Sequence, residues 1–433
     1  MSTALTDIHC ELLVIGTGMA GMAAAAFAAQ RGIDTVLVGM TGEIGFASGL
    51  LDVLGVHPLT AENTWSDPWK ALERLVADWP EHPYARIGGA TIRTAMAEFL
   101  AVLAAADLPY RPPSGRNVRV LTPLGTLKTT YAVPESMAAV ATALEDRRPG
   151  LLVDFQGLKG FSARQIKATL GDRWPALKTK RLPFPGLSGE LQSERMARRL
   201  ENPRVREELA RAIGRHLGGA GVVGLPAVLG VARTRQVFTE IQDTLGVPVF
   251  EIPTMLPAVT GLRLRECLER QLTRMGVRAR YQNKVLAAPS LTDEGLTAAV
   301  GGEKAEVRVR ARAAVLASGR FFGQGLHADR HAIRETVFDL PVYQPADRTH
   351  WHRKQLFDRA GHPIHRAGLA VDAMMRPCGA EGHYLHPNLF AAGSILAHQD
   401  WIRQKCGSGL AIASAYAAVR ASQNVLGRTP SAA

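Results

Sequence analysis

The first 40 residues change their hydrophobic period in a way that predicts a strand, a tight turn and a helix. Residues 12–15 form an unbroken apolar run, which is typical of a strand buried on both faces. Residues 19–30 are rich in alanine and stop before Gly32, which predicts a helix. A second apolar run follows at 35–38. The pattern predicts a strand, a helix and a second strand, the unit from which parallel sheets are built.

Apolar and amphipathic segments continue to alternate further along the chain. A helical pattern covers 92–106. Beyond it, the expected order is strand, helix, strand, helix and strand, at 150–155, 164–170, 221–225, 235–245 and 248–252. This alternation predicts parallel strands joined by helices. We therefore expect an inserted α/β domain at 61–255.

The first sheet is expected to resume after this insertion. A helix is predicted at 261–275 and an apolar strand at 313–317, and a second insertion, rich in His and Arg, fills 323–385. A strand at 389–392 and a helix to about residue 425 close the chain. The predicted fold class is α/β: a discontinuous Rossmann-like domain with an inserted α/β domain and a smaller second insertion. The segments of the discontinuous domain are 8–60, 256–322 and 386–426.

Three glycines at the end of the first strand indicate a chemical role. Gly16 allows the tight turn, Gly18 lets backbone N–H groups approach a phosphate, and Gly21 brings the helix close to the sheet. Met19 and Ala20 begin the helix, whose N-terminus then faces the anion. Because strand and helix flank the glycines, the spacing predicts a dinucleotide or flavin site.

The second strand lacks the acidic residue that usually binds the ribose of an adenosine cofactor. The chain has Val38, Gly39 and Met40 there, and the nearest acid, Glu43, comes late. Either an adenosine ribose is held in another way, or the cofactor has no adenosine, as in FMN.

The composition is that of an ordinary globular protein with two or three domains. No apolar run approaches the roughly 20 residues of a membrane span, and no basic and apolar leader precedes the first strand. We therefore expect a cytoplasmic protein. The four cysteines fit neither a disulfide framework nor an iron–sulfur site, so onward electron transfer needs another chain. They are Cys10, Cys267, Cys378 and Cys406.

The net charge of +12 is concentrated in one part of the sequence. Residues 159–216 hold 14 Lys and Arg against 6 Asp and Glu, which gives +8. Such a stretch could dock nucleic acid, anionic lipid or an acidic partner. Solvated helix faces are the simpler interpretation, and nucleic acid is disfavoured because few aromatic residues are interleaved.

Short motifs along nearly the whole chain resemble the two-dinucleotide-binding-domain flavoproteins, and most closely the B subunit of anaerobic glycerol-3-phosphate dehydrogenase. The glycine turn is followed, in the order of that family, by further matching segments. These are Ala47-Ser-Gly-Leu-Leu-Asp52, His82-Pro-Tyr84, Leu121-Thr-Pro-Leu-Gly-Thr-Leu127, Gly261-Leu-Arg-Leu-Arg265, Leu316-Ala-Ser-Gly-Arg-Phe-Phe322, Asn388-Leu-Phe-Ala-Ala-Gly-Ser394 and Cys406-Gly-Ser-Gly409.

The resemblance implies a cofactor, an activity and partners. The B subunit of that family carries FMN, which agrees with the missing ribose acid, and FAD is the alternative. The complex oxidises sn-glycerol 3-phosphate to dihydroxyacetone phosphate. A FAD-containing A-type subunit is one partner, and an iron–sulfur C-type subunit passes electrons to the membrane quinone. The chain would then be peripheral on the inner face of the cell membrane through these partners, and would bind no nucleic acid.

Two glycine turns near the C-terminus are expected to contact the flavin. Gly407, Ser408 and Gly409 open the last helix, whose N-terminus would stabilise negative charge on the reduced flavin. Gly393 and Ser394 occupy the place where many relatives have Gly-Asp, whose acid contacts the ribityl chain.

Two earlier segments complete the expected flavin contacts. Ser48 and Gly49 follow the second strand and are expected beside the flavin ring or the phosphate. Ser318 and Gly319 end the strand at 313–317. Asp52 is equally well explained as a helix cap or a structural acid.

Oxidation of a secondary alcohol needs a base for its proton, and a phosphate needs cations. Lys128 and Arg263 are candidate cations, although Arg263 also fits a salt-bridged surface position. His398 is the candidate base, because histidine is close to neutral at physiological pH, although relatives commonly have a small residue there. Histidine pairs occur at 350 and 352, 362 and 365, and 383 and 386, but no accompanying ligand set predicts a metal site.

Three alternatives remain open from the sequence. The flavin could serve another hydroxy acid or polyol, with the inserted domain setting specificity. The chain could instead be a non-catalytic electron-relay or assembly subunit that docks through its basic stretch. Modification of nucleic acid by a flavoprotein of similar fold is a distant third.

Overall fold

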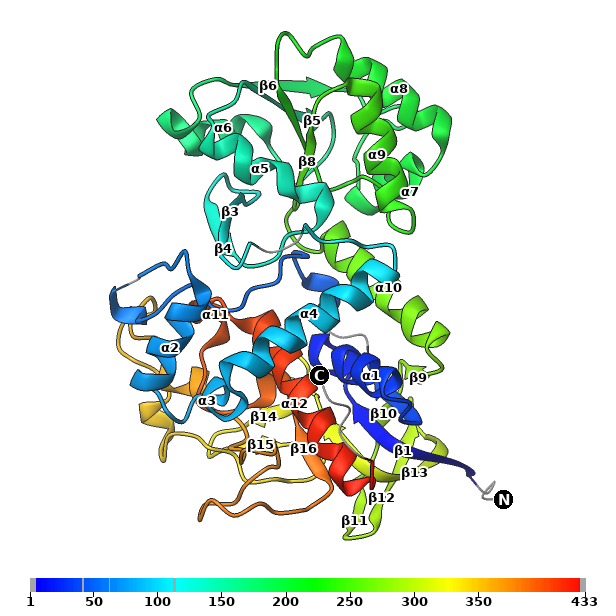
Figure 1. Cartoon of the computed structure of the whole chain (residues 1–433), viewed down its shortest axis with the longest axis vertical. Coiled ribbons are helices and arrows are strands. Elements are labelled where there is room, and N and C mark those ends of the chain that lie inside the picture. Colours follow the sequence, from blue (N-terminus) through cyan, green and yellow to red (C-terminus); the bar gives the residue numbers. More distant parts are fainter. Residues whose placement is uncertain (1–4, 41–42, 62, 112–113, 429–433) are drawn as a thin grey trace. The chain divides into compact units, whose positions relative to one another are not determined.

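A computed structural model describes residues 5–40, 43–61, 63–111 and 114–428. The chain forms two compact units, shown in Figure 1. Unit 1 consists of Met1–Glu43, Asp52–Val102 and Arg270–Ala433, and unit 2 consists of Ile44–Leu51 and Leu103–Glu269. Each unit therefore combines separate stretches of the sequence. Two of the boundaries between the units, at residues 102 and 269, fall inside helices.

Unit 1 is built on an eight-stranded sheet with a parallel centre. In this sheet β1 pairs in parallel with β2 on one side and β13 on the other, while β9 and β16 extend the parallel part at its two sides. A meander of β10, β11 and β12 joins the first half of β13. The strands are β1 (Thr6–Ile15), β2 (Thr35–Gly39), β9 (Arg278–Tyr281), β10 (Lys284–Val285), β11 (Ser290–Thr292), β12 (Gly295–Gly301), β13 (Ala305–Leu316) and β16 (Leu389–Ala391).

Strand β13 shows why only part of this sheet is visible in the sequence. Its last four residues, 313–316, are continuously buried because parallel neighbours lie on both sides. Its first half alternates between buried and exposed positions and pairs antiparallel with β12. The apolar run predicts the buried half at 313–317, whereas the Arg-rich half at 305–311 lies outside that expectation.

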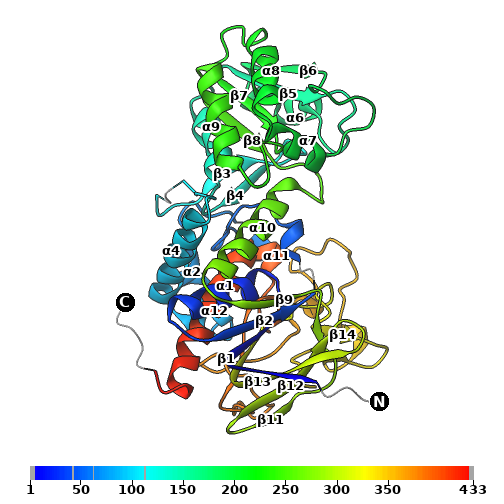
Figure 2. The ribbon, with the colours of Figure 1, turned by 90° about the vertical axis from the view of Figure 1, so that its right-hand side faces the viewer.

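Three helices of unit 1 meet around one aromatic cluster. Helix α1 (Met19–Gln30) and helix α12 (Gly407–Val425) pack together on the sheet, as Figure 2 shows. Phe27 of α1 lies edge-on to Tyr416 of α12, with ring centroids 5.1 Å apart, and 6.2 Å from Phe99 of α4 (Gly89–Ala105). Glu98 accepts hydrogen bonds from Arg31 and from the Tyr416 hydroxyl. These contacts join the first and the last helix of the chain.

The stretch between residues 64 and 88 contains helices for which no prediction was made from the sequence. Helix α2 (Pro68–Asp78) begins after Asp67, whose side chain accepts from the backbone amides of Trp69 and Lys70. Helix α3 (Pro83–Ile87) begins after His82, which caps it in the same way. Proline stands at the start of both helices, where it costs no hydrogen bond. The remaining described part of unit 1 adds the hairpin β14 (Leu326–Ala328) and β15 (Ile333–Glu335), and helix α11 (Trp401–Gln404).

Unit 2 holds a four-stranded parallel sheet in the order β6, β5, β7, β8. Its strands are β5 (Gly150–Phe155), β6 (Leu177–Leu182), β7 (Val222–Pro226) and β8 (Val249–Ile252), and a separate hairpin pairs β3 (Val118–Leu121) with β4 (Leu127–Thr130). Its helices are α5 (Glu135–Glu145), α6 (Ala163–Leu170), α7 (Ser193–Leu200), α8 (Pro203–Gly214), α9 (Thr234–Leu245) and the part of α10 (Val259–Arg274) up to Glu269. Trp174 and Phe250 stack within its core.

The α/β fold class is confirmed, because both units combine parallel strands with helices. The boundaries of the domains remain a prediction. The sequence places an insertion at 61–255, whereas residues 52–102 belong to unit 1 by their contacts. The predicted second insertion, 323–385, also belongs to unit 1.

Candidate functional site

The glycine turn after β1 divides into two packing positions and one open position. A side chain on Gly16 would overlap the carbonyl of Ala317, and one on Gly21 would overlap the carbonyl of Gly16. Gly16 also has φ +119°, a conformation that L side chains rarely adopt. A Cβ on Gly18 would meet nothing within 4 Å. Gly18 is therefore the position at which a ligand has room to approach.

The first turn of α1 presents backbone donors beside Gly18. Gly18 is extended and has no side chain with which to cap the helix. No described residue accepts a hydrogen bond from the N–H groups of Met19, Ala20 or Gly21. Free amides at a helix N-terminus favour an anion, and here they follow an open glycine. The arrangement fits a phosphate group of a nucleotide.

The end of β2 is closed to the acid that a ribose would require. A side chain at Gly39 would come within 2.6 Å of the Thr17 amide nitrogen. The Thr17 hydroxyl donates to the carbonyl of Met40, which fixes this crossing of the two segments. The side chain of Glu43 lies outside the described residues. Gly39 therefore has no room for an acidic side chain, whereas Met40 after it is exposed.

Ser318 and Gly319 follow β13 next to the glycine turn. The amide of Ala317 donates to the carbonyl of Ile15, which holds the two strand ends together. The Ser318 hydroxyl is buried and has no hydrogen-bond partner among the described residues. A buried hydroxyl without a partner is costly unless a ligand or water completes it. Ser318 therefore fits the predicted role of a cofactor contact.

The turn at Gly393 packs directly on the first turn of α1. Gly393 has φ +87°, and a side chain on it would approach the Ala20 Cβ to 2.6 Å. Its amide donates to the Ser414 hydroxyl at 2.8 Å. The carbonyl of Ser394 accepts from Arg320 at 2.7 Å. The turn is thus held from three directions beside the predicted phosphate position.

The last helix begins at a turn that is partly committed to the fold. The amide of Gly409 donates to the Asp52 carbonyl at 2.7 Å, and the Ser408 hydroxyl accepts from the Asp52 amide at 2.6 Å. Gly407 lies against the ring of Trp401, where a Cβ would come within 2.7 Å. No described residue accepts from the amides of Gly407 and Ser408. Two donors at this helix N-terminus therefore remain for a ligand, while the Ser408 side chain anchors the backbone of Asp52.

The predicted contacts Ser48, Gly49 and Lys128 belong to unit 2. The Ser48 hydroxyl accepts from the Leu50 amide at 3.3 Å, and the Gly49 carbonyl accepts from the Tyr110 hydroxyl at 2.5 Å. Lys128 lies on β4, opposite Val120 of β3. Their roles at the flavin or the substrate stay predictions.

Arg263 is engaged in a buried ion pair of unit 2. Its guanidinium donates to both carboxylate oxygens of Glu251, at 2.5 and 2.8 Å, and to the Gly230 carbonyl at 2.7 Å. Glu251 also accepts from the Ser136 hydroxyl and the Leu229 amide. The Arg263 and Glu251 side chains are 3% and 0% exposed, so all these partners are internal. Arg263 fits neither the predicted role of a substrate cation nor the alternative of a surface salt bridge.

His398 has an unusual backbone and a defined ring environment. Its φ is +61°, and its ring centroid lies 4.1 Å from that of Tyr343. Its Nδ1 lies 3.4 Å from an oxygen of Glu81. Burial lowers the pKa of His398 below its usual value, and Arg86 and Arg366 lower it further while Glu81 opposes them. His398 is therefore neutral at physiological pH and can accept a proton.

Arg320 is an important residue that the sequence interpretation did not single out. It donates to the carbonyls of Ser394, Leu396 and Gln399, and to that of His365. One side chain thus holds the segment after Gly393 against the segment containing His365. Arg320 lies within the motif at 316–322, one of those on which the family resemblance rests, and this was the sequence feature that could have indicated it.

One of the three histidine pairs, His362 and His365, has internal hydrogen-bond partners. His362 accepts from the Arg353 amide at one ring nitrogen, and the other lies 2.9 Å from the Leu356 carbonyl. His365 places Nδ1 3.1 Å from Asp400. Within the described parts of the chain, no group of three or more His, Cys, Asp or Glu side chains could hold a metal ion.

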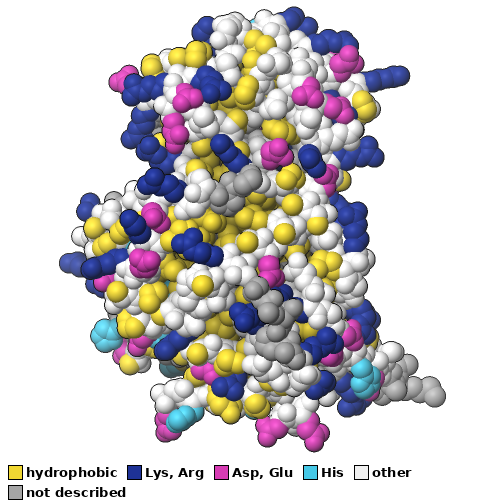
Figure 3. Space-filling view, viewed as in Figure 1, with side chains coloured by type: hydrophobic (Ala, Val, Ile, Leu, Met, Phe, Trp, Pro, Cys, Tyr) yellow, Lys and Arg dark blue, Asp and Glu magenta, His cyan; other side chains and the backbone are white. Residues whose placement is uncertain are grey.

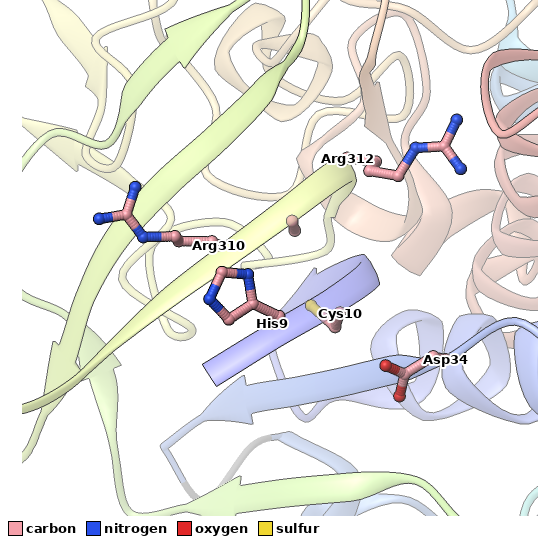
Figure 4. A pocket seen from close by; sticks show the side chains of 6 residues that line it. His9, Cys10, Asp34, Arg310 and Arg312 are labelled. Carbon is pink, nitrogen blue, oxygen red and sulfur yellow. The ribbon is translucent and has the colours of Figure 1, made fainter. Parts of the chain in front are cut away.

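A surface depression in unit 1 lies away from these turns. Figure 4 shows His9, Cys10, Asp34, Arg310 and Arg312 around it, along β1 and β13 and before β2. Burial, the largest cause, raises the pKa of the Cys10 thiol to about 12, so the thiol stays protonated. Since Gly16 follows the opposite end of β1, this depression is not the phosphate position.

The basic stretch at 159–216 forms ion pairs within unit 2. Arg181 pairs with Asp154, and Arg206 pairs with Glu240. Figure 3 shows Lys and Arg spread over the visible face of unit 2, with Asp and Glu between them. This distribution supports the interpretation as a solvated face.

Comparison with known proteins gives the same cofactor class as these turns. Residues 11–410 match the family described as FAD binding domain. The B subunit of anaerobic glycerol-3-phosphate dehydrogenase from Vibrio cholerae is 31% identical over 424 residues, which cover 95% of this chain and 96% of that protein. The chain belongs to this family of B-subunit flavoproteins.

Two further proteins align with this chain over nearly the whole length of both partners. A Halobacterium salinarum protein, named as a probable B subunit of anaerobic glycerol-3-phosphate dehydrogenase, is 35% identical over 428 residues, covering 95% of this chain and 97% of that protein. Among solved structures, 3-ketosteroid delta1-dehydrogenase from Sterolibacterium denitrificans aligns with 12% identity and a TM-score of 0.43, covering 97% of this chain and 99% of that one. A likeness at that score carries no argument about function.

Family and geometry together establish a flavin as the cofactor class. The open Gly18, the free amides of α1 and α12 and the unpartnered Ser318 hydroxyl all fit a nucleotide cofactor. Among the residues that the structure describes, no helix combines the length and the apolar composition needed to cross a bilayer.

Proposed function

We propose that this chain is the flavin-binding subunit of a respiratory, anaerobic-type glycerol-3-phosphate dehydrogenase, and that it oxidises sn-glycerol 3-phosphate to dihydroxyacetone phosphate. The observation that supports this most is the identity of 31% to 35% with B-subunit proteins over 95% of the chain. The first glycine turn of unit 1 adds a physical reason, because the open Gly18 and the free amides at the start of α1 fit the phosphate of a cofactor.

Different groups of unit 1 have different roles in the proposed reaction. A bound flavin supplies the acceptor for the hydride that leaves C2 of the substrate. His398 accepts the proton of the C2 hydroxyl on Nε2, while Nδ1 faces Glu81. The two free amides at the start of α12 stabilise negative charge on the cofactor side. The alcohol thus loses a hydride and a proton and becomes a ketone.

The bound flavin could be FMN or FAD, and different observations favour each. The description of the matching family favours FAD. The resemblance to the B subunits and the closed end of β2 favour FMN, because a side chain at Gly39 would overlap Thr17. If FAD is bound, its ribose must be held by another group. Release of the cofactor from the purified protein, followed by chromatography and mass measurement, distinguishes the two.

The relatives are named as B subunits, which supports an enzyme of several subunits, and the partners we propose are those that the family resemblance implies. A FAD-containing partner of the A type and an iron–sulfur partner of the C type would receive and forward the electrons to membrane quinone. The cysteines of this chain support a separate carrier, because all four are buried and lie far apart in the sequence. Through these partners the chain would lie at the cytoplasmic face of the membrane.

Anaerobic stopped-flow spectroscopy tests the proposed activity. We expect sn-glycerol 3-phosphate to bleach the flavin absorbance of the purified chain, whereas glycerol and 2-hydroxy acids leave it unchanged. Bleaching by another polyol or hydroxy acid would change the substrate. Bleaching only when the A-type partner is present would make this chain an electron relay.

A further inference from the structure

Arg366 stands apart from the other arginines near the C-terminal turns of unit 1. Its guanidinium lies 3.9 Å from the ring centroid of Trp79 and is partly buried. No described residue accepts a hydrogen bond from this guanidinium or forms an ion pair with it. By contrast, Arg320 donates to four carbonyls and Arg376 pairs with Asp372. A partly buried cation without an anion is costly, so an anionic ligand would stabilise it.

The position of Arg366 is fixed relative to the Gly393 turn. Its carbonyl accepts from the amide of His398 at 2.9 Å. The residue before it, His365, is held through its carbonyl by Arg320, which also holds Ser394. Arg366 is therefore linked to the candidate base, His398, by one backbone hydrogen bond. The Arg320 side chain links its neighbour His365 to the predicted flavin turn at Ser394.

The carboxylates near Arg366 are committed to other groups. Asp400 lies 3.1 Å from His365 Nδ1 and 3.7 Å from Arg403. Glu81 faces His398, and its side chain is 70% exposed. The pKa of Arg366 is lowered chiefly by burial, with Asp400 and Tyr343 opposing. The cation is therefore not neutralised by its neighbours.

We propose that Arg366 binds the phosphate of the substrate, with His398 beside it at the carbinol end. This inference rests on the proposed function and adds to it the anion-binding residue of the same site. Stacking on Trp79 uses the face of the guanidinium and leaves the N–H groups at its edge free. That edge matches two phosphate oxygens, which a lysine cannot match.

The simpler explanation is an arginine that merely packs on a tryptophan. The chain provides a matched example, because Arg93 of α4 lies 3.6 Å from the ring centroid of Trp69. Arg93 is exposed, whereas Arg366 is partly buried and hydrogen-bonded through its backbone to the candidate base. Arg93→Gln therefore controls for the loss of a stacked charge.

The test uses the full chain with its bound flavin and isothermal titration calorimetry. The probes are sn-glycerol 3-phosphate, inorganic phosphate and glycerol. For Arg366→Gln we expect the Kd of sn-glycerol 3-phosphate to rise roughly 10- to 100-fold, as for loss of a charge-assisted hydrogen-bond pair. Arg366→Lys should recover only part of this loss, and Arg93→Gln should bind like the wild type. Flavin content per chain should be unchanged in all three variants.

The possible outcomes distinguish an error in the phosphate site at Arg366 from an error in the proposed function. If Arg366→Gln binds sn-glycerol 3-phosphate as tightly as the wild type, the phosphate site is wrong while the proposed function stands. If the wild type binds inorganic phosphate through Arg366 but binds glycerol 3-phosphate no better, the anion site stands and the proposed substrate fails. If the wild type binds neither phosphate compound, or if Arg93→Gln weakens binding equally, the inference is overturned.

Discussion

The two units contain arginines that the protein uses in opposite ways. In unit 2, Arg263 makes three internal hydrogen bonds to Glu251 and to the Gly230 carbonyl, and both side chains of the ion pair are buried. In unit 1, Arg366 stacks on Trp79 and has no anionic partner among the described residues. From the sequence, Arg263 was one of two candidate cations, with a surface salt bridge as its alternative, and Arg366 was not considered.

The two arginines differ in whether an internal carboxylate pairs with the guanidinium: Glu251 pairs with Arg263, whereas no carboxylate among the described residues forms an ion pair with Arg366. A buried ion pair with every donor satisfied cannot release its arginine to a ligand without leaving Glu251 charged and unpaired. An arginine whose edge faces no carboxylate can bind a substrate without breaking the fold. The same contrast holds for glycines: Gly21 is closed by the Gly16 carbonyl, whereas Gly18 faces open space.

The largest effect should come from filling the open glycine position. Gly18→Glu places a carboxylate where the phosphate approaches the amides of α1, so we expect complete loss of flavin from the purified protein. Gly18→Ala should fold like the wild type, since a Cβ there meets no protein atom within 4 Å, and it should lose less flavin than Gly18→Glu because it adds no charge. The measurement is the ratio of flavin to protein absorbance. Full flavin content in Gly18→Glu would disprove the phosphate position.

Local periodicity was sufficient to predict much of the scaffold. Helix α1 has the predicted bounds 19–30, and β5 has the predicted bounds 150–155. Both are decided by neighbouring residues: an alanine-rich run ended by glycine, and a short apolar run. The glycine positions followed for the same reason, since strand, turn and helix are contiguous.

The side-chain contacts of the site could not be predicted in this way. Arg320 reaches carbonyls 45 to 79 residues further along the chain, and no local pattern encodes such contacts. The ion pair of Arg263 likewise depends on Glu251 at the end of β8. Helix α2 was not predicted, although Asp67 and Pro68 form a recognisable helix start.

The next effect is the loss of the candidate base. We expect His398→Gln to slow flavin reduction by sn-glycerol 3-phosphate roughly 10²- to 10⁴-fold, the usual contribution of a general base. Burial lowers the pKa of His398, so the wild-type rate should be highest near pH 8 and fall as the pH drops through the lowered pKa. Stopped-flow rates between pH 5 and 8 measure this.

The variant also tests the assignment of that pH dependence. In His398→Gln the acid limb of the profile should disappear, because the titrating group is gone. Retention of the same limb would assign the titration to another group. Glu81 and Arg86 are the charged neighbours whose variants would then be measured.

The last expected effect concerns stability, for which we expect Arg263 to matter more than Arg366. Arg263→Gln leaves the buried Glu251 carboxylate without its cation, which should destabilise unit 2 by about 3 to 5 kcal/mol. Arg366→Gln removes no hydrogen bond or ion pair to a described residue and loses only the stacking on Trp79, so it should destabilise unit 1 by about 1 kcal/mol or less. Hydrogen exchange of the β5 and β8 amides reports opening of unit 2 directly and avoids treating a protein of two units as one cooperative transition. Equal protection in Arg263→Gln and wild type would mean that the ion pair contributes little, and the contrast between a structural and a ligand-binding arginine would then rest on Arg366 alone.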